Sequence, residues 1–171
     1  MLREHAKLLR LMQQTGEIVG RKKLQKMVYI AQQLELPFTE KFQYHVYGPY
    51  SEELTLRVEE VCALNFVEEI KEEKASYTQY RYQLDGRGEE FLAQADPEAA
   101  DAETFARFAA DLNQQTARFL ELVSTIFYFS EMEKPDVALK IRKLKAKQNY
   151  SDEEIDSAYE YIAHLQHVLG S

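Results

Sequence analysis

The chain has 171 residues, 45% of them hydrophobic, which suffices for one core and a helical extension but not for two independent domains. Its formal net charge of −8 opposes broad attachment to nucleic acid or anionic lipid, because both need positive counter-charge. A single cysteine, Cys62, excludes an internal disulfide and a zinc site made of cysteines alone. Residues 1–13 do not resemble a signal peptide and no apolar run is long enough to span a bilayer, so we expect a cytoplasmic protein.

Two helices are predicted in the first forty residues. Apolar residues recur at helical spacing over residues 2–12 and again over residues 21–34, and the second helix must end before Pro37. Four cations lie at the start of the second helix, where the macrodipole disfavours positive charge: Arg21, Lys22, Lys23 and Lys26. Local helix energetics therefore do not account for them, and a tertiary or binding role is worth testing.

A short strand and a third helix follow. Residues 42–47 alternate and are rich in aromatic side chains, which predicts a strand that Gly48 and Pro49 end. Ser51 is then expected to accept a hydrogen bond as the N-cap of a helix. The apolar positions of that helix face inward, and they are Leu54, Val58, Val61 and Leu64.

A β-hairpin and a fourth helix complete the first half of the chain. Residues 66–70 and 78–84 are strand-like and are joined by a polar tip. Asp85 can cap a helix in which Gly88 permits close approach of another backbone. The order helix, helix, helix, hairpin, helix predicts a winged-helix-like module over residues 1–96 in a mainly α protein.

Residues 97–171 are expected to form a helical extension. Apolar spacing predicts one long helix over residues 105–126, a helix that Pro135 opens, and a final helix with a capping box of Ser151 and Glu154.

One stretch of this extension, residues 122–129, is apolar on nearly every side, so it should be buried or lie at a subunit contact. Because the helices after it are short, we expect a homodimer that buries part of it through the C-terminal helices.

Three motifs carry a resemblance to known proteins. They are KKLQKMVYIAQ at residues 22–32, YHVYGPYSEEL at residues 44–54 and YRYQLDGRGEEFL at residues 80–92. Together they resemble the YwgA-type proteins of Bacillus and, more distantly, the Panacea group, which includes SocA-like antitoxins and phage-associated GepA-like proteins. The resemblance implies a winged-helix-related fold used in regulation, in which some distant relatives act as antitoxins or proteolytic adaptors rather than as DNA readers.

The charge pattern argues against a DNA reader. A winged-helix DNA-binding protein normally has a basic recognition helix and a basic wing, since phosphate contacts supply most of the affinity. Here the third predicted helix carries four glutamates against Arg57, and the hairpin carries four glutamates against three cations. We therefore predict a non-enzymatic regulatory or adaptor protein that acts through protein–protein interaction. The alternative is a winged-helix transcriptional regulator, and a metal-dependent enzyme is a distant third.

No catalytic, cofactor-binding or metal-binding residue is predicted. The sequence has no His-Glu-x-x-His, no phosphate-binding glycine loop and no Gly-x-Ser-x-Gly motif. Cys62 is expected to be a small buried hydrophobe rather than a nucleophile, and His45 a structural polar group. Glu160, His164 and His167 share one helix face with the spacing of metal ligands, but histidine near a helix C-terminus is ordinary.

The candidate partner-binding residues are Arg21, Lys22, Lys23, Lys26, Tyr47 and Tyr50. Tyrosine rings bury area at small entropic cost, while neighbouring cations select an acidic partner. The alternative is that the lysine stems cover apolar surface and pair with acids such as Glu17, while the two tyrosines fill the core.

A second basic cluster lies near the C-terminal end of the helix that Pro135 opens, where positive charge is favourable, so a solvated face is expected. Its members are Lys140, Arg142, Lys143, Lys145 and Lys147.

Overall fold

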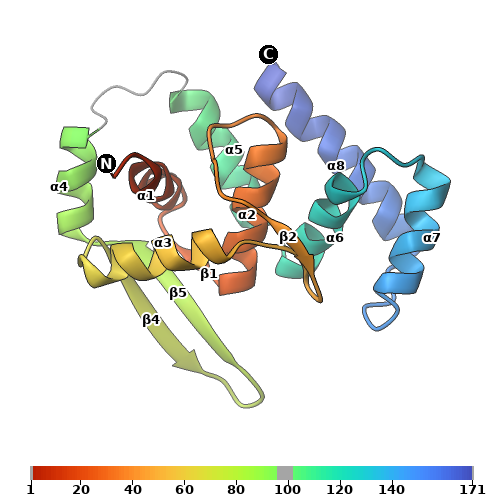
Figure 1. The fold of residues 1–171 in the computed structure, drawn as a ribbon, viewed down its shortest axis with the longest axis horizontal. Coiled ribbons are helices and arrows are strands. Elements are labelled where there is room, and N and C mark those ends of the chain that lie inside the picture. The colour runs from red at the N-terminus through yellow and green to blue at the C-terminus, as the bar shows by residue number, and fades with distance from the viewer. Residues whose placement is uncertain (1, 96–101, 171) are drawn as a thin grey trace.

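The computed structural model describes residues 2–95 and 102–170, which form a mainly helical protein with a small amount of antiparallel sheet (Figure 1). The helices are α1 (Arg3–Thr15), α2 (Arg21–Gln33), α3 (Glu52–Ala63), α4 (Gly86–Ala95), α5 (Ala102–Gln114), α6 (Ala117–Tyr128), α7 (Lys134–Leu144) and α8 (Asp152–Gly170). The strands are β1 (Ile18–Val19), β2 (Gln43–His45), β3 (Gly48–Tyr50), β4 (Val67–Glu73) and β5 (Thr78–Leu84).

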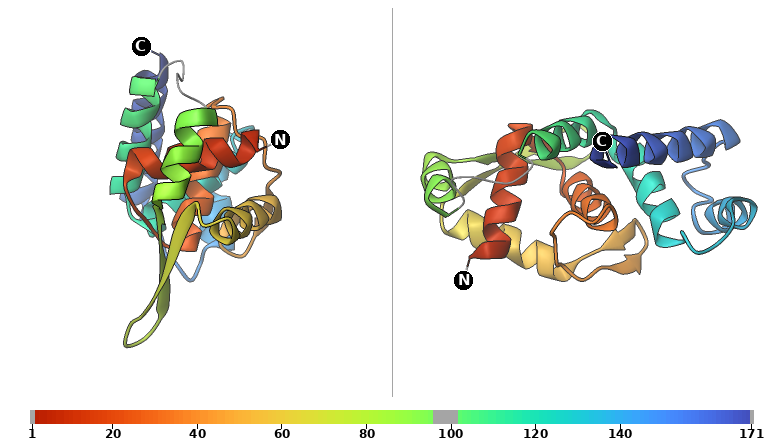
Figure 2. Two further views of the ribbon diagram at one scale, coloured as in Figure 1. Left: turned by 90° about the vertical axis from the view of Figure 1, so that its left-hand side faces the viewer. Right: turned by 90° about the horizontal axis from the view of Figure 1, so that it is seen from above.

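Two small antiparallel sheets are present in the described residues. The first has the order β1-β5-β4, and its β4–β5 hairpin, which the sequence predicts, projects away from the helices (Figures 1 and 2). In the second, β2 pairs with β3, so that Tyr44 faces Pro49 across a tight turn at residues 46–47. Strand β1 was not predicted, because two residues are too few to show an alternating pattern.

Several helix starts agree with the local signals. The Ser51 hydroxyl accepts a bond from the backbone N–H of Leu54 at 3.1 Å. At the start of α8, Glu154 N–H donates to the Ser151 hydroxyl and Ser151 N–H donates to the Glu154 carboxylate, both at 3.0 Å, which confirms the capping box. Gly88 is required by close approach, since a side chain there would collide with the backbone carbonyl of Phe66, the residue before β4.

The prediction of one long helix over residues 105–126 is wrong. Helix α5 ends at Gln114, and α6 begins at Ala117. Between them Thr116 has an extended backbone, and its hydroxyl accepts a bond from the Phe119 N–H at 3.1 Å, which starts a new helix. Apolar spacing continues across the break, and the pattern therefore concealed it.

The described parts of both halves of the chain share one hydrophobic core. Helix α6 packs against α2, and α5 packs against α1, while α4 and α7 lie toward opposite ends of the molecule (Figure 2). Residues 122–127 are buried within a single chain, so this part of the apolar stretch needs no second copy to cover it. The predicted connection after residue 95, and with it the expected domain boundary, falls mostly at residues 96–101, outside the described residues.

Among the described residues, no helix is long and apolar enough to cross a membrane.

Candidate binding cavity

A cavity of about 260 Å³ lies beside α2 and α3. It brings together five of the six candidate residues, which come from two segments separated in the sequence: Arg21, Lys22, Lys26, Tyr47 and Tyr50. Its other walls are Leu24, Gln25, Leu54, Thr55, Val58, Glu59, Glu69 and Tyr82. The sixth candidate, Lys23, turns elsewhere, and its ammonium donates to the backbone carbonyl of Asn113.

The amide of Gln25 fixes α2 against the start of α3. Its nitrogen donates to the Ser51 carbonyl at 2.9 Å, and its oxygen accepts from the Ser51 N–H at 2.8 Å. The Gln25 nitrogen also bonds the hydroxyl of Thr55, which in turn lies 2.9 Å from the hydroxyl of Tyr50. Sequence reasoning missed Gln25, because a glutamine within a helical pattern carries no signal of burial.

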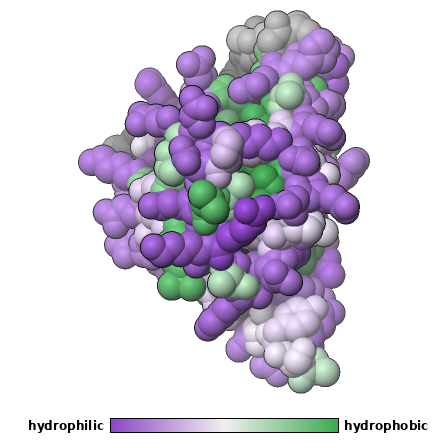
Figure 3. Space-filling model, turned by 90° about the vertical axis from the view of Figure 1, so that its right-hand side faces the viewer, coloured by the Kyte–Doolittle hydropathy of each residue, from purple (hydrophilic) through white to green (hydrophobic). Residues whose placement is uncertain are grey.

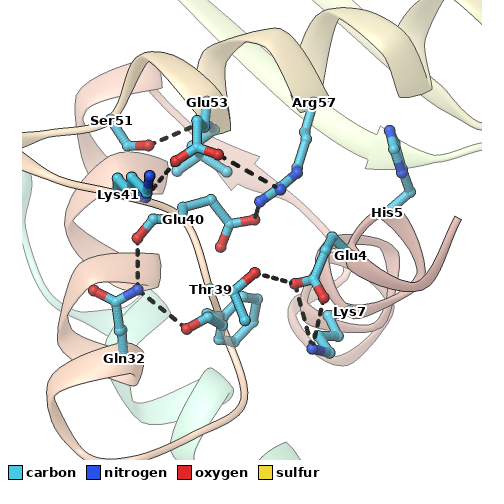
Figure 4. Close-up of polar contacts among 12 residues, drawn as sticks. Glu4, His5, Lys7, Gln32, Thr39, Glu40, Lys41, Ser51, Glu53 and Arg57 are labelled. Atoms are coloured by element: carbon cyan, nitrogen blue, oxygen red, sulfur yellow. Dashed lines mark hydrogen bonds and ion pairs between the residues drawn. The ribbon is translucent and has the colours of Figure 1, made fainter. Parts of the chain in front are cut away.

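The loop that leads into β2 is held by a second set of polar contacts (Figure 4). Gln32 donates to the backbone carbonyls of Phe38 and Glu40 at 3.1 and 2.6 Å. The buried Glu40 carboxylate pairs with Arg57 of α3. Arg57 is therefore committed to an intramolecular ion pair, and the loop enters the β2–β3 turn from a defined position.

A buried charge cluster adjoins the cavity. Glu121 of α6 is 0% exposed, and Lys26 and Lys145 are 1% and 2% exposed. The Glu121 carboxylate accepts from Lys145 at 3.0 Å and from Gln148 at 3.1 Å, and it also pairs with Lys22. Three lysines thus surround one carboxylate.

Two of these lysines also hold the β2–β3 turn. The Lys26 ammonium donates to the Pro49 carbonyl at 2.6 Å, and the Lys145 ammonium donates to the Val46 carbonyl at 2.7 Å. Tyr47, between these two attachment points, is 61% exposed, and the Lys22 ammonium lies 5.1 Å from the centre of its ring. The backbone of the turn is therefore held by two buried lysines, while the Tyr47 side chain stays at the surface.

Burial and charge act in opposite directions on the cluster. Burial lowers the pKa of Lys26 to about 7, although the Glu121 carboxylate acts to raise it and the ammonium groups of Lys22 and Lys145 lower it further. Burial acts to raise the pKa of Glu121, but hydrogen bonds from Lys22 and Lys145 outweigh it and hold that pKa below its usual value.

Arg21 lies at the other side of the cavity and is bound to the three-stranded sheet. Its guanidinium carbon is 3.6 Å from the centre of the Tyr80 ring, and its Nε donates to the Tyr82 hydroxyl at 3.1 Å. One guanidinium nitrogen is 3.5 Å from the carboxylate of Glu69. Its side chain nevertheless remains 59% exposed.

Three sequence-based expectations need correction. Lys145 does not belong to a solvated face, because its ammonium is buried against Glu121. Lys26 is likewise interior rather than on an exposed patch. The acid that pairs with Lys22 is Glu121, whereas Glu17 pairs with Arg81.

Two of the remaining candidates for chemistry, His164 and His45, make structural contacts. The His164 ring nitrogen lies 2.8 Å from Asp111, and the Tyr161 hydroxyl donates to the same carboxylate at 2.7 Å, which joins α8 to α5. The ring of His45 lies 5.0 Å from that of Tyr50. Burial raises the pKa of the half-buried Cys62 to about 11, so that its thiol stays protonated at neutral pH. Within residues 2–95 and 102–170, no group of three or more potential ligands from His, Cys, Asp and Glu could hold a metal ion.

Comparison with known proteins gives one full-length relative. The uncharacterized protein YwgA of Bacillus subtilis (strain 168) is 49% identical over 168 residues, which are 98% of this chain and 99% of that protein. No protein-family model matches the chain.

Proposed function

The chain belongs to the YwgA family, and we propose that it is a non-enzymatic regulatory or adaptor protein that binds another protein at the cavity beside α2 and α3. The observation that carries this proposal is the convergence of two separate motifs on one cavity. The motif at residues 22–32 supplies Lys22 and Lys26, Arg21 directly precedes it, and the motif at residues 44–54 supplies Tyr47 and Tyr50.

The geometry of the turn favours a protein partner. Tyr47 is exposed beside Lys22, and tyrosine next to a cation is a frequent combination at the energetic centre of interfaces. Because Lys26 and Lys145 hold the turn from within, little conformational entropy remains to be lost when a partner binds.

The order of elements supports the winged-helix interpretation of residues 1–96. The chain runs through α1, β1, α2, α3, β4, β5 and α4, with β2 and β3 inserted between α2 and α3, and β1 pairs with β5 at the edge of the hairpin. A winged-helix module that binds proteins also fits the distant resemblance to the Panacea group. Fold alone does not decide between protein and DNA, so the site carries the functional argument.

A DNA-binding regulator is the alternative, and the charges of α3 disfavour it. Arg57, the single basic residue of α3, pairs with the buried Glu40, while Glu52, Glu59 and Glu60 are exposed. Phosphate would meet negative charge on this surface, so we expect only weak, sequence-independent retention of duplex DNA at physiological salt. Sequence-selective binding at nanomolar concentration would favour the alternative.

The predicted homodimer through the C-terminal helices stays a prediction. Residues 122–127 are buried in one chain, so they do not require a second copy to cover them. What supports the homodimer now is the face that carries α7, where Leu139 and Leu144 are exposed and where Figure 3 shows apolar side chains among polar ones.

The proposal is tested by affinity capture from nuclease-treated cell extract with two matched variants. Tyr47→Ser removes the ring at the cavity, and Tyr77→Ser removes a ring of nearly equal exposure, 59% against 61%, near the hairpin tip. We expect Tyr47→Ser to lose the captured protein, and Tyr77→Ser to retain it, at unchanged melting temperatures. Equal capture by both variants would contradict the proposed site.

A further inference from the structure

The geometry points to a specific group in the cavity: the carboxylate of an Asp or Glu side chain of the partner protein, bound between Lys22 and Lys26. A neighbouring apolar side chain of the partner would then contact Leu54 and Val58. This inference rests on the proposed function and names the chemistry by which the partner is recognised.

The buried cluster contains more lysines than carboxylates. The ammonium groups of Lys22, Lys26 and Lys145 surround the single carboxylate of Glu121. Lys26 is buried, and its ammonium donates to the uncharged Pro49 carbonyl. Positive charge without a matching anion is costly in the interior, so an anion entering from the cavity would offset that cost.

The start of α2 adds to the attraction. The N-cap residue of α2 is Gly20, so no side chain at this position caps the helix. The first turn of α2 contains no acidic residue. The positive end of the helix dipole lies at Arg21 and Lys22, which line the cavity, so it adds to the positive potential there.

The amount of charge favours a carboxylate over a phosphate. One of the three ammonium groups is balanced by Glu121, and the Lys26 ammonium already donates to the Pro49 carbonyl while burial lowers its pKa. The remaining charge suits one monoanion rather than a phosphate dianion. On the other side, Glu59 and Glu69 line the cavity and would repel a second acid, so a single acidic residue is expected rather than a run of them.

The residues that line the cavity indicate which partner side chains lie next to the acidic one. Leu24, Leu54 and Val58 supply apolar surface between the two charged ends. Tyr47 and the side chain of Arg21 remain 61% and 59% exposed beside the cavity, so a ligand that fills it leaves aromatic and cationic surface for contacts outside. A chain that continues beyond the cavity uses that surface, whereas a small free acid does not.

The test is selection of randomised heptapeptides displayed on phage against the immobilised full chain. We expect the selected peptides to share one Asp or Glu next to Leu, Ile, Val or Phe. In a resynthesised peptide, replacing that acid by its amide should weaken binding at least about tenfold, since a charge-assisted hydrogen bond is lost.

Variants of the protein supply a second readout. Lys22→Met should weaken the acidic peptide about tenfold and its amide analogue little, whereas Lys143→Met, an exposed lysine of α7, should change neither. Binding should also be weaker at pH 9 than at pH 6, because the carboxylate favours the protonated form of Lys26, which faces Lys22, Glu121 and Lys145.

The outcomes separate the inference from the proposed function. Selected peptides without an acid, or an acidic peptide that binds equally well as its amide, overturn the inference and leave a protein-binding function standing. Selection of no peptide, together with successful Tyr47-dependent capture of a protein, overturns the acidic-residue inference but not the protein-binding function. Selection of no peptide, together with failed capture, overturns both.

Discussion

At the scale of single residues, Gly48 is the point at which the β2–β3 turn meets the charge cluster. Its φ of 89° lies in the region that favours glycine, and a Cβ there would be 3.5 Å from the Thr125 hydroxyl and 3.6 Å from the Glu121 side chain. We predict that Gly48→Ala lowers the free energy of unfolding by about 1–2 kcal/mol. Gly86→Ala is the control, because its backbone needs no positive φ and the site is open.

Chemical denaturation of both variants measures this difference. Equal stability of Gly48→Ala and Gly86→Ala would show that the turn is less constrained than the contacts of Gly48 indicate.

Lys26 makes a prediction about pH. Its pKa falls from 10.5 to about 7 on folding, so between these values the unfolded chain binds more protons than the folded one. Stability contributed by this group therefore rises with pH, by up to about 1.4 kcal/mol for each pH unit. The free energy of unfolding of the unmodified protein should increase from pH 7 to pH 9. Lys26→Met should show a flatter dependence, and an identical slope in the two proteins would contradict the burial of an ionisable amine.

The sequence alone does not predict that Lys26 lies in the interior. Lys22, Lys23 and Lys26 are adjacent in one helical pattern, and only their tertiary contacts decide which of them is buried. Lys145 was misplaced for the same reason: its partner Glu121 lies on another helix, and no local pattern links the two. The resemblance to the YwgA-type proteins did, however, single out both motifs that line the cavity.

At the scale of elements, the local capping and turn signals were reliable guides. Ser51, the Ser151–Glu154 box and the hairpin before Asp85 all act as their chemistry predicts. Periodicity alone was less informative. It hid the break between α5 and α6, and it had too little length to reveal β1.

The break between α5 and α6 gives a prediction at this scale. Thr116→Ala removes the hydroxyl that accepts from the Phe119 N–H, and it should lower the free energy of unfolding by about 1 kcal/mol. Thr116→Asp keeps an acceptor at the same position and should retain most of the stability. Thermal or denaturant unfolding separates the two, and an equal loss in both would mean that the cap does not stabilise α6.

At the scale of the whole molecule, the second half of the chain completes the site. Helix α6 provides Glu121, and Lys145 follows α7, so residues 97–171 contribute to the cluster that anchors the β2–β3 turn. The expected division into a module and an extension therefore describes the order of the chain, while the core and the candidate site draw on both halves.

The measurement that tests the proposed site most directly is photo-crosslinking from three surface positions of similar exposure. A photoreactive benzoylphenylalanine replaces Tyr47 at the cavity, Tyr77 near the hairpin tip or Leu139 on α7, which are 61%, 59% and 62% exposed. Irradiation in cell extract should give a covalent adduct with a different protein from position 47 and not from the other two, whereas an adduct between two copies of this chain from position 139 belongs to the predicted homodimer. An adduct with a different protein from position 77 or 139, with none from position 47, would contradict the assignment of the cavity as the binding site.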